Sequence, residues 1–151
     1  MIKVSKEVLT LFDVLVTDEA PDFEALTLCH TLFEEAQPKV QTVLSLTDLA
    51  GQTTTDVCTS YGEQDEFVSA AFHRLVKLNF YRLLRRRLGL SAMPWGILYG
   101  IRPLKIVHRW LDQGLSAKSI EARLWERYEV SAEKAQLLTS VARYQRPFLF
   151  P

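Results

Sequence analysis

The sequence predicts an α+β fold: a small, mainly antiparallel sheet covered by two helices, followed by a three-helix C-terminal subdomain. Two observations support it. The first half contains short runs rich in Val, Leu and Thr, separated by turn residues. The second half contains apolar residues at helical spacing behind serine caps. Within 151 residues, 48% of them hydrophobic, we expect a sheet-and-helix subdomain over residues 1–92, a loop plus helical subdomain over 93–146, and a linker over 147–151.

The N-terminal part predicts one strand and one helix. Apolar residues alternate over residues 10–16, which is the period of a strand. Acidic residues and Pro21 then supply a turn and the negative start that a helix prefers. Apolar side chains at helical intervals over residues 22–37 predict a widely buried helix that ends at Pro38.

The central part predicts a hairpin and the longest helix. Residues 39–47 and 53–60 are rich in Val, Leu and Thr, and the threonines indicate that one face of this hairpin is wet. A helix is expected over residues 65–88, with Gly89 as its stop. Its sheet-facing side should carry Val68, Phe72, Leu75, Val76 and Leu83, and its opposite side Arg74, Lys77, Tyr81 and Arg85.

An apolar loop precedes the C-terminal helices. Gly96 and Gly100, four residues apart and next to Trp95, indicate close backbone approach or positive φ. Arg102 follows, and Pro103 suits the first position of a helix because its missing N–H leaves no donor unsatisfied there. We therefore expect a structural loop that delivers one arginine to the start of a helix.

Three short helices should follow this loop. They are predicted over residues 103–113, 116–128 and 131–144, the second and third of them behind serine caps. The tail from residue 146 to 151 is predicted to be apolar and non-helical, and to lead into a longer protein.

The net charge of zero conceals a strong asymmetry. Residues 1–72 hold three lysines and thirteen acidic residues, a net charge of −10, whereas residues 73–110 hold nine basic residues and no acid, a net charge of +9. Such a division predicts intramolecular pairing, or an anionic partner for the basic part, and pairing is favoured. The expected anion or interdomain contacts are Arg85, Arg86, Arg87, Arg102, Lys105 and Arg109.

The sequence contains no recognisable catalytic or metal-binding motif. The chain has no GxSxG, HExxH, P-loop or GxGxxG motif. Cys29 and Cys58 lack CxxC spacing and are expected to be small buried residues. His30 is expected to be buried and hydrogen-bonded rather than a metal ligand. We therefore expect no catalytic, cofactor-binding or metal-binding residue in this part.

Targeting and membrane segments are also missing from the sequence. No basic signal peptide begins the chain, and no apolar run is long enough to cross a bilayer. We therefore expect a cytoplasmic protein without a membrane partner.

One stretch carries a resemblance to a known family. Its residues run from Trp95 to Lys105 as WGILYGIRPLK, followed by a helix ending at Gln113-Gly114 and then by Tyr128, Ser131-Ala132-Glu133-Lys134 and Gln145-Arg146. This pattern resembles the N-terminal region of HemZ-type oxygen-independent coproporphyrinogen III oxidases, or coproporphyrinogen dehydrogenases, of the radical S-adenosylmethionine superfamily. The resemblance is strongest between Trp95 and Arg146 and fades before Glu66.

The resemblance implies that the parent protein is an oxidoreductase of porphyrin and haem biosynthesis. Its hallmark would be a CxxxCxxC triplet that binds a four-iron four-sulfur cluster, which cleaves S-adenosylmethionine. This chain has no such triplet, so the resemblance implies a catalytic barrel after Pro151 and an accessory role for this part. The barrel is then the expected partner, and a porphyrinogen, through its propionates, is a second one.

A nucleic-acid-binding or protein-interaction module is the alternative. The basic stretch 73–110 carries Trp95, Tyr99 and Trp110 beside helices, a composition that nucleic-acid platforms use. The second and third predicted helices are close to charge-balanced, whereas a recognition helix should be plainly basic. Nucleic acid is therefore the less favoured partner, and the apolar tail supports the protein-interaction version.

Overall fold

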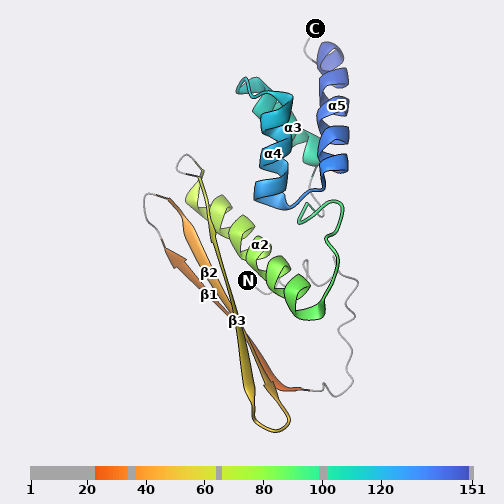
Figure 1. Cartoon of the computed structure of the whole chain (residues 1–151). Helices are drawn as coiled ribbons and strands as arrows, with labels where there is room; N and C mark the ends of the chain where they lie inside the picture. Colours follow the sequence, from red (N-terminus) through yellow and green to blue (C-terminus); the bar gives the residue numbers. More distant parts are fainter. Residues whose placement is uncertain (1–22, 34–36, 64–65, 99–101, 150–151) are drawn as a thin grey trace. The chain divides into compact units, whose positions relative to one another are not determined.

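A computed structural model of the chain describes residues 23–33, 37–63, 66–98 and 102–149 (Figure 1). The chain divides into two compact units, unit 1 (Met1–Ser91) and unit 2 (Ala92–Pro151). An antiparallel sheet followed by helices confirms the α+β class. The strand predicted over residues 10–16 lies outside the described residues.

Unit 1 contains a three-stranded antiparallel sheet in the order β1-β2-β3. Its strands are β1 (Phe23–Phe33), β2 (Lys39–Asp48) and β3 (Thr53–Tyr61). The predicted hairpin is confirmed as β2 and β3. In its turn, the Asp48 carboxylate accepts hydrogen bonds from the backbone N–H groups of Ala50 (2.9 Å) and Gln52 (2.8 Å). The threonines at the start of β3 are exposed, as expected for a wet face.

The helix predicted over residues 22–37 is wrong, because β1 occupies most of that segment. Leu28, His30 and Leu32 recur at every second residue, so the same sequence also fits a strand. β1 pairs antiparallel with β2 along its length, and His30 lies opposite Thr42. Strand pairing therefore outweighs the helical spacing of the apolar residues in this segment. Among the described helices, one rather than two covers the sheet.

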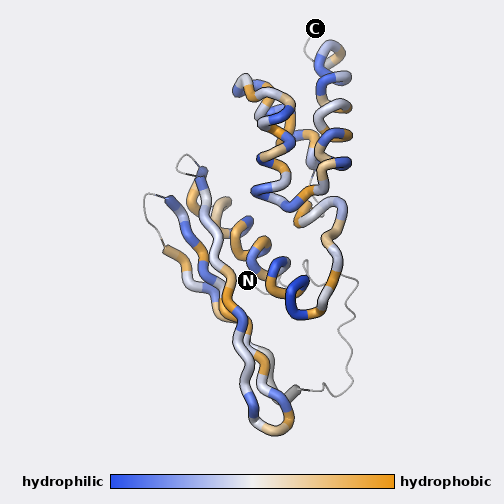
Figure 2. The backbone as a smooth tube through the Cα atoms, viewed as in Figure 1, coloured by the Kyte–Doolittle hydropathy of each residue, from blue (hydrophilic) through white to orange (hydrophobic). Residues whose placement is uncertain are grey.

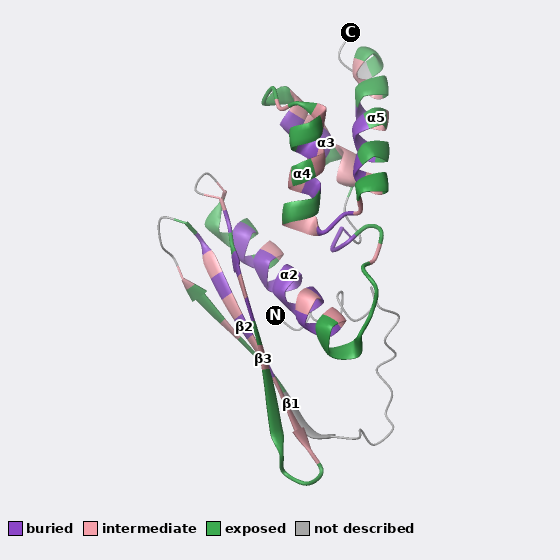
Figure 3. Cartoon of the chain, viewed as in Figure 1, coloured by how far each residue is buried: buried purple, intermediate pink, exposed green. Residues whose placement is uncertain are grey.

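That helix is α2 (Val68–Leu88), which packs on β2 and β3 (Figures 1 and 3). Its apolar side contributes to two buried clusters with the sheet: Val40, Phe72, Leu75 and Val76 in one, and Leu44, Cys58 and Leu83 in the other. The predicted stop is confirmed at Gly89, whose φ is +63° and whose N–H donates to the Arg85 carbonyl.

The opposite side of α2 is not the polar face that the helical pattern predicts. Tyr81 is fully buried and Lys77 is also buried. The helix is therefore enclosed on more than one side, which a single apolar stripe could not reveal. Lysine and tyrosine can both be placed in this way because each has a long apolar body behind its polar end.

Unit 2 contains three helices, α3 (Pro103–Asp112), α4 (Ala117–Tyr128) and α5 (Ala132–Leu149), as predicted. Ser116 caps α4 by accepting a hydrogen bond from the Ser119 N–H (3.2 Å), and Ser131 caps α5 through the Lys134 N–H (3.3 Å). Their shared core includes Val107, Trp110, Ile120, Leu124, Val130 and Leu138.

Helix α5 is longer than predicted. The chain was expected to leave the helix before residue 146, but α5 continues to Leu149 with Pro147 inside it. Proline removes one backbone donor there. Two side-chain contacts favour the extra turn: Arg146 pairs with Asp112 of α3 at 2.7 Å, and the rings of Tyr144 and Phe148 lie 5.8 Å apart.

None of the described helices combines the length and the apolar character that spanning a bilayer requires.

Candidate functional site

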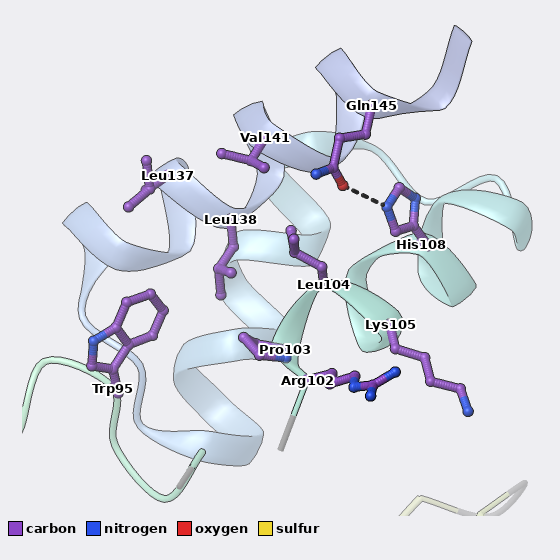
Figure 4. Close-up of a pocket in the computed structure, with 10 residues that line it drawn as sticks. All are labelled: Trp95, Arg102, Pro103, Leu104, Lys105, His108, Leu137, Leu138, Val141 and Gln145. Carbon is purple, nitrogen blue, oxygen red and sulfur yellow. Dashed lines mark hydrogen bonds between the residues drawn. The ribbon is translucent and has the colours of Figure 1, made fainter. Parts of the chain in front are cut away.

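Unit 2 contains a groove of about 910 Å³ along α3 and α5 (Figure 4). Its lining residues are Trp95, Arg102, Pro103, Leu104, Lys105, His108, Leu137, Leu138, Val141 and Gln145. Most of these side chains are apolar, and the few polar groups come mainly from α3. An apolar groove with a small number of placed polar groups is typical of a binding site.

The loop before α3 is fixed by a close approach of two backbone segments. Gly96 has a φ of +53°, and a Cβ on this residue would lie 2.6 Å from the Glu129 carbonyl. The Ile97 N–H donates a 2.9 Å hydrogen bond to the Tyr128 carbonyl. The predicted close approach is therefore confirmed at Gly96, whereas Gly100 lies outside the described residues.

This loop holds Trp95 at one end of the groove, near Leu137 (Figure 4). On the N-terminal side of Trp95, the Pro94 carbonyl accepts a 2.9 Å hydrogen bond from the Ser131 N–H. The Lys134 ammonium lies 5.6 Å from the centre of the indole ring. Backbone hydrogen bonds and a cation thus hold an aromatic side chain that is still 38% exposed.

The floor of the groove belongs to the folded core of unit 2. Leu138 of α5 is part of the buried cluster, and Leu104 of α3 packs against that cluster. Val141 and Leu137 continue the apolar wall along α5 (Figure 4). Because core packing sets two of the lining leucines, the apolar floor is formed when the unit folds and does not need a ligand.

A positively charged rim follows the start of α3. Arg102 is the residue before the helix and Pro103 lies in its first turn, as predicted. The side chains of Arg102 and Lys105 are exposed, and neither forms an ion pair with a described residue. The first N–H groups of a helix add partial positive charge. The rim therefore favours a carboxylate or another anion, which a guanidinium can bind through two hydrogen bonds.

The far end of the groove carries a weaker polar pair. The His108 Nε2 and the Gln145 Oε1 lie 3.4 Å apart and join α3 to α5 (Figure 4). This pair sets where the apolar part of the groove ends.

The other predicted contact residues lie in unit 1, at the C-terminal end of α2. Arg87 donates to the Thr54 hydroxyl (2.6 Å) and lies 3.7 Å from the Asp56 carboxylate. Arg86 donates to the Val57 carbonyl at 3.4 Å. These two arginines hold the helix to β3.

Arg85 completes this group, and its guanidinium lies 5.7 Å from the Tyr81 ring. The six predicted contact residues thus fall into two sets, Arg85, Arg86 and Arg87 on α2 and Arg102, Lys105 and Arg109 at α3. Of the six, Arg102 and Lys105 line the groove.

The histidine and cysteine predictions have mixed outcomes. His30 is half-buried and its Nδ1 lies 2.9 Å from the Thr42 hydroxyl, in agreement with a hydrogen-bonded histidine. Cys58 is buried, and its thiol donates to Asn79 at 3.4 Å. The expectation that Cys29 is buried is wrong, because Cys29 lies in β1 on the side of the sheet that faces away from α2.

In the described part of the chain, no three His, Cys, Asp or Glu side chains gather as metal ligands would. The groove offers cations, an imidazole–amide pair and apolar surface, without a nucleophile beside a base. Its cations and apolar side chains are suited to binding an anion or an apolar surface.

The sequence analysis missed the α5 side of the groove. Leu137, Val141 and Gln145 line it, but no residue of the helix predicted over 131–144 was expected to contact a partner. The signal that could have revealed the surface is a second apolar row at helical spacing, Leu137, Val141, Tyr144 and Phe148.

The chain is partly similar to a known protein. It is 35% identical over 66 residues to the oxygen-independent coproporphyrinogen-III oxidase-like protein HemZ of Bacillus subtilis (strain 168). The match covers 44% of this chain and 13% of that protein. No protein-family model and no solved structure matches the chain. The similarity therefore relates part of this chain to a small part of a coproporphyrinogen oxidase-like protein.

Proposed function

We propose that the chain is the N-terminal accessory region of a radical S-adenosylmethionine coproporphyrinogen III dehydrogenase-like enzyme, and that it supports or gates the catalytic barrel. The observation that carries this proposal is the partial similarity to HemZ. The groove adds support, because an apolar surface with a cationic rim suits contact with another domain or with an amphipathic anion.

The residues of this chain do not fit the cluster that such an enzyme needs. A four-iron four-sulfur cluster requires thiolates in a CxxxCxxC triplet, whereas this chain has two cysteines, 29 residues apart. Of these two, Cys58 is buried against α2 and Cys29 is exposed on β1. The proposed division of labour therefore gives cluster binding and S-adenosylmethionine cleavage to the barrel and gives binding to this region.

The test compares the longer protein with a version that lacks residues 1–151, after anaerobic reconstitution of both. We expect the shortened protein to keep its iron–sulfur absorbance and its cleavage of S-adenosylmethionine. Its conversion of coproporphyrinogen III should fall at least about tenfold, since an accessory region acts through binding and orientation. Adding residues 1–151 as a separate chain should restore part of the conversion.

Two results would contradict the proposal. One is a shortened protein that converts coproporphyrinogen III as fast as the longer one. The other is a coding sequence after Pro151 without a CxxxCxxC triplet. Retention of a labelled oligonucleotide by residues 1–151 with a steep salt dependence would instead favour the nucleic-acid alternative.

A further inference from the structure

Helix α5 carries an apolar surface that extends beyond the groove. Leu137, Val141, Tyr144 and Phe148 recur at intervals of four, three and four residues and so share one side of the helix. We call them the α5 apolar stripe. Leu137 is 47% exposed, Tyr144 75% and Phe148 73%. Apolar positions recurring along α5 are visible in Figure 2.

The α5 apolar stripe extends past the groove that a small ligand would fill. It runs over twelve residues, and the eleven steps between its ends cover about 16 Å at the rise of an α-helix. Leu137 and Val141 lie in the groove, whereas Tyr144 and Phe148 do not line it. A ligand confined to the groove would leave both aromatic rings in water. Covering the whole stripe requires an elongated apolar partner.

A second row, made of cations, runs along α3. Arg102, Lys105 and Arg109 follow one another at intervals of three and four residues and are all exposed. We call them the α3 basic stripe. None of them forms an ion pair in the described part of the chain, although Arg146 of the neighbouring helix pairs with Asp112 at 2.7 Å. This row of charge is therefore available to a partner.

The two stripes lie on the two helices that form the groove, with Leu104 and Leu138 between them (Figure 4). From this juxtaposition we propose that unit 2 binds an amphipathic helix of a partner, whose apolar ridge enters the groove and whose flanking carboxylates meet the α3 basic stripe. Apolar grooves commonly receive helices through anchors at i, i+3, i+4 and i+7. The cations then determine the orientation of the bound helix in the groove.

Charge complementarity also separates this occupant from a second copy of the chain. A second copy would bring another unpaired row of three cations to the same interface, and burying cations without partners is costly. An acidic helix neutralises the row. The inference concerns the groove itself and does not depend on the proposed enzyme, because any partner with such a helix would satisfy it.

The experiment uses two fluorescein-labelled helical peptides of about 18 residues, or five turns. Both carry the same leucine ridge, but one has glutamates and the other lysines beside the ridge. In fluorescence anisotropy at low salt, the 151-residue chain should bind the glutamate peptide at least about tenfold more tightly than the lysine peptide.

Variants assign the binding to the two stripes. Leu137→Asp with Tyr144→Asp should weaken the glutamate peptide at least about tenfold, since both side chains are exposed and their loss should leave the fold intact. Gln136→Asp, exposed and about 100° around the helix from Leu137, is the matched control and should bind like the wild type. The triple variant R102E, K105E and R109E should prefer the lysine peptide.

Three results would overturn the proposal, given circular dichroism that shows each variant folded. The first is equal affinity of the chain for the two peptides. The second is binding that the α5 double variant leaves unchanged. The third is a chain that binds neither peptide but associates with itself or binds coproporphyrin, where the same double variant abolishes that self-association or coproporphyrin binding. The deletion test of the proposed function would be unaffected by any of them.

Discussion

The cations of the basic interval 73–110 have different surroundings in unit 1 and in unit 2. In unit 1, Arg74 pairs with Glu66, and Arg82 donates to the Ser60 hydroxyl at 3.0 Å. In unit 2, the cations of the α3 basic stripe have no ion-pair partner among the described residues. The basic interval of the sequence is therefore structural in one unit and available in the other, although its composition is uniform.

Exposed apolar residues differ between the units in the same sense. Those of unit 1 are scattered, for example Leu49 in a turn and Phe67 before α2. In unit 2, Leu137, Tyr144 and Phe148 line up along α5, whereas Trp95 lies in the loop and Trp125 on α4. Single exposed apolar residues need no explanation, whereas an aligned row beside a groove indicates an interaction surface. Under our proposal, unit 1 therefore acts as a scaffold and unit 2 as a binding module.

The largest expected effect tests whether the fold of unit 2 depends on the close backbone contact at Gly96. Gly96→Ala should lower the free energy of unfolding of unit 2 by about 3 kcal/mol or more, because a Cβ would collide with the Glu129 backbone at a positive φ. All three tryptophans, Trp95, Trp110 and Trp125, lie in unit 2. Urea unfolding followed by tryptophan fluorescence therefore reports on this unit.

Gly114→Ala is the matched control for that variant. Gly114 also has a positive φ, +78°, but no atom lies within 4 Å of the position that its Cβ would take. It should lose only about 1 kcal/mol, the cost of left-handed backbone in a residue with a side chain. Equal losses in the two variants would show that the loop is not held by the contact we describe.

The second prediction compares a poorly exposed ion pair of unit 1 with a more exposed ion pair of unit 2. The ion pairs Arg74–Glu66 and Arg146–Asp112 have the same N···O distance, 2.7 Å, but side-chain exposures of 8% and 13% against 34% and 54%. Arg74→Met should cost about 3 kcal/mol, because it removes the guanidinium from beside the Glu66 carboxylate in a poorly solvated place. Arg146→Met should cost less than about 1 kcal/mol. Urea unfolding followed by circular dichroism measures both, and similar losses would contradict the contrast.

The sequence predicts the fold wherever local signals and long-range pairing agree. The hairpin, α2 with its Gly89 stop, and the capped helices of unit 2 all carry such signals. The apolar residues of the β1 segment fit both the helical and the strand period, and only the pairing of β1 with β2 decides between the two structures. The end of α5 was missed for a related reason, since Pro147 is a local stop signal that contacts within unit 2 override.

The candidate site was predicted on one side only. Arg102, Pro103 and Lys105 carry charge and turn chemistry that can be recognised in the sequence, and they do border the groove. Leu137 on α5 resembles any core residue until the fold shows that Leu138 fills the core instead. The direction in which an apolar residue faces is settled by packing, so the groove could not be read from the sequence.

The smallest effect concerns pH and the buried polar network of unit 1. Asn79 donates to the Val40 carbonyl (3.0 Å) and to the Thr42 hydroxyl (3.2 Å). The Thr42 hydroxyl therefore has its own proton free to donate to the His30 Nδ1, 2.9 Å away. Protonating that nitrogen would require the Thr42 hydroxyl to turn and accept a second hydrogen bond instead of donating one. Burial lowers the pKa of His30 below its ordinary value of 6.5.

Because the pKa of His30 is lower in the folded chain, the unfolded chain takes up the proton first as the pH falls. The stability of unit 1 should therefore decrease from pH 7.5 to pH 5, beginning near the ordinary histidine pKa. In His30→Asn, whose amide oxygen can accept from Thr42 without titrating, this part of the pH dependence should disappear, as measured by urea midpoints. His73→Asn, at an exposed position of α2, is the control. If His30→Asn and the wild type show the same pH dependence, the hydrogen-bond direction inferred for Thr42 is wrong, and unit 1 does not depend on a neutral histidine beneath its helix.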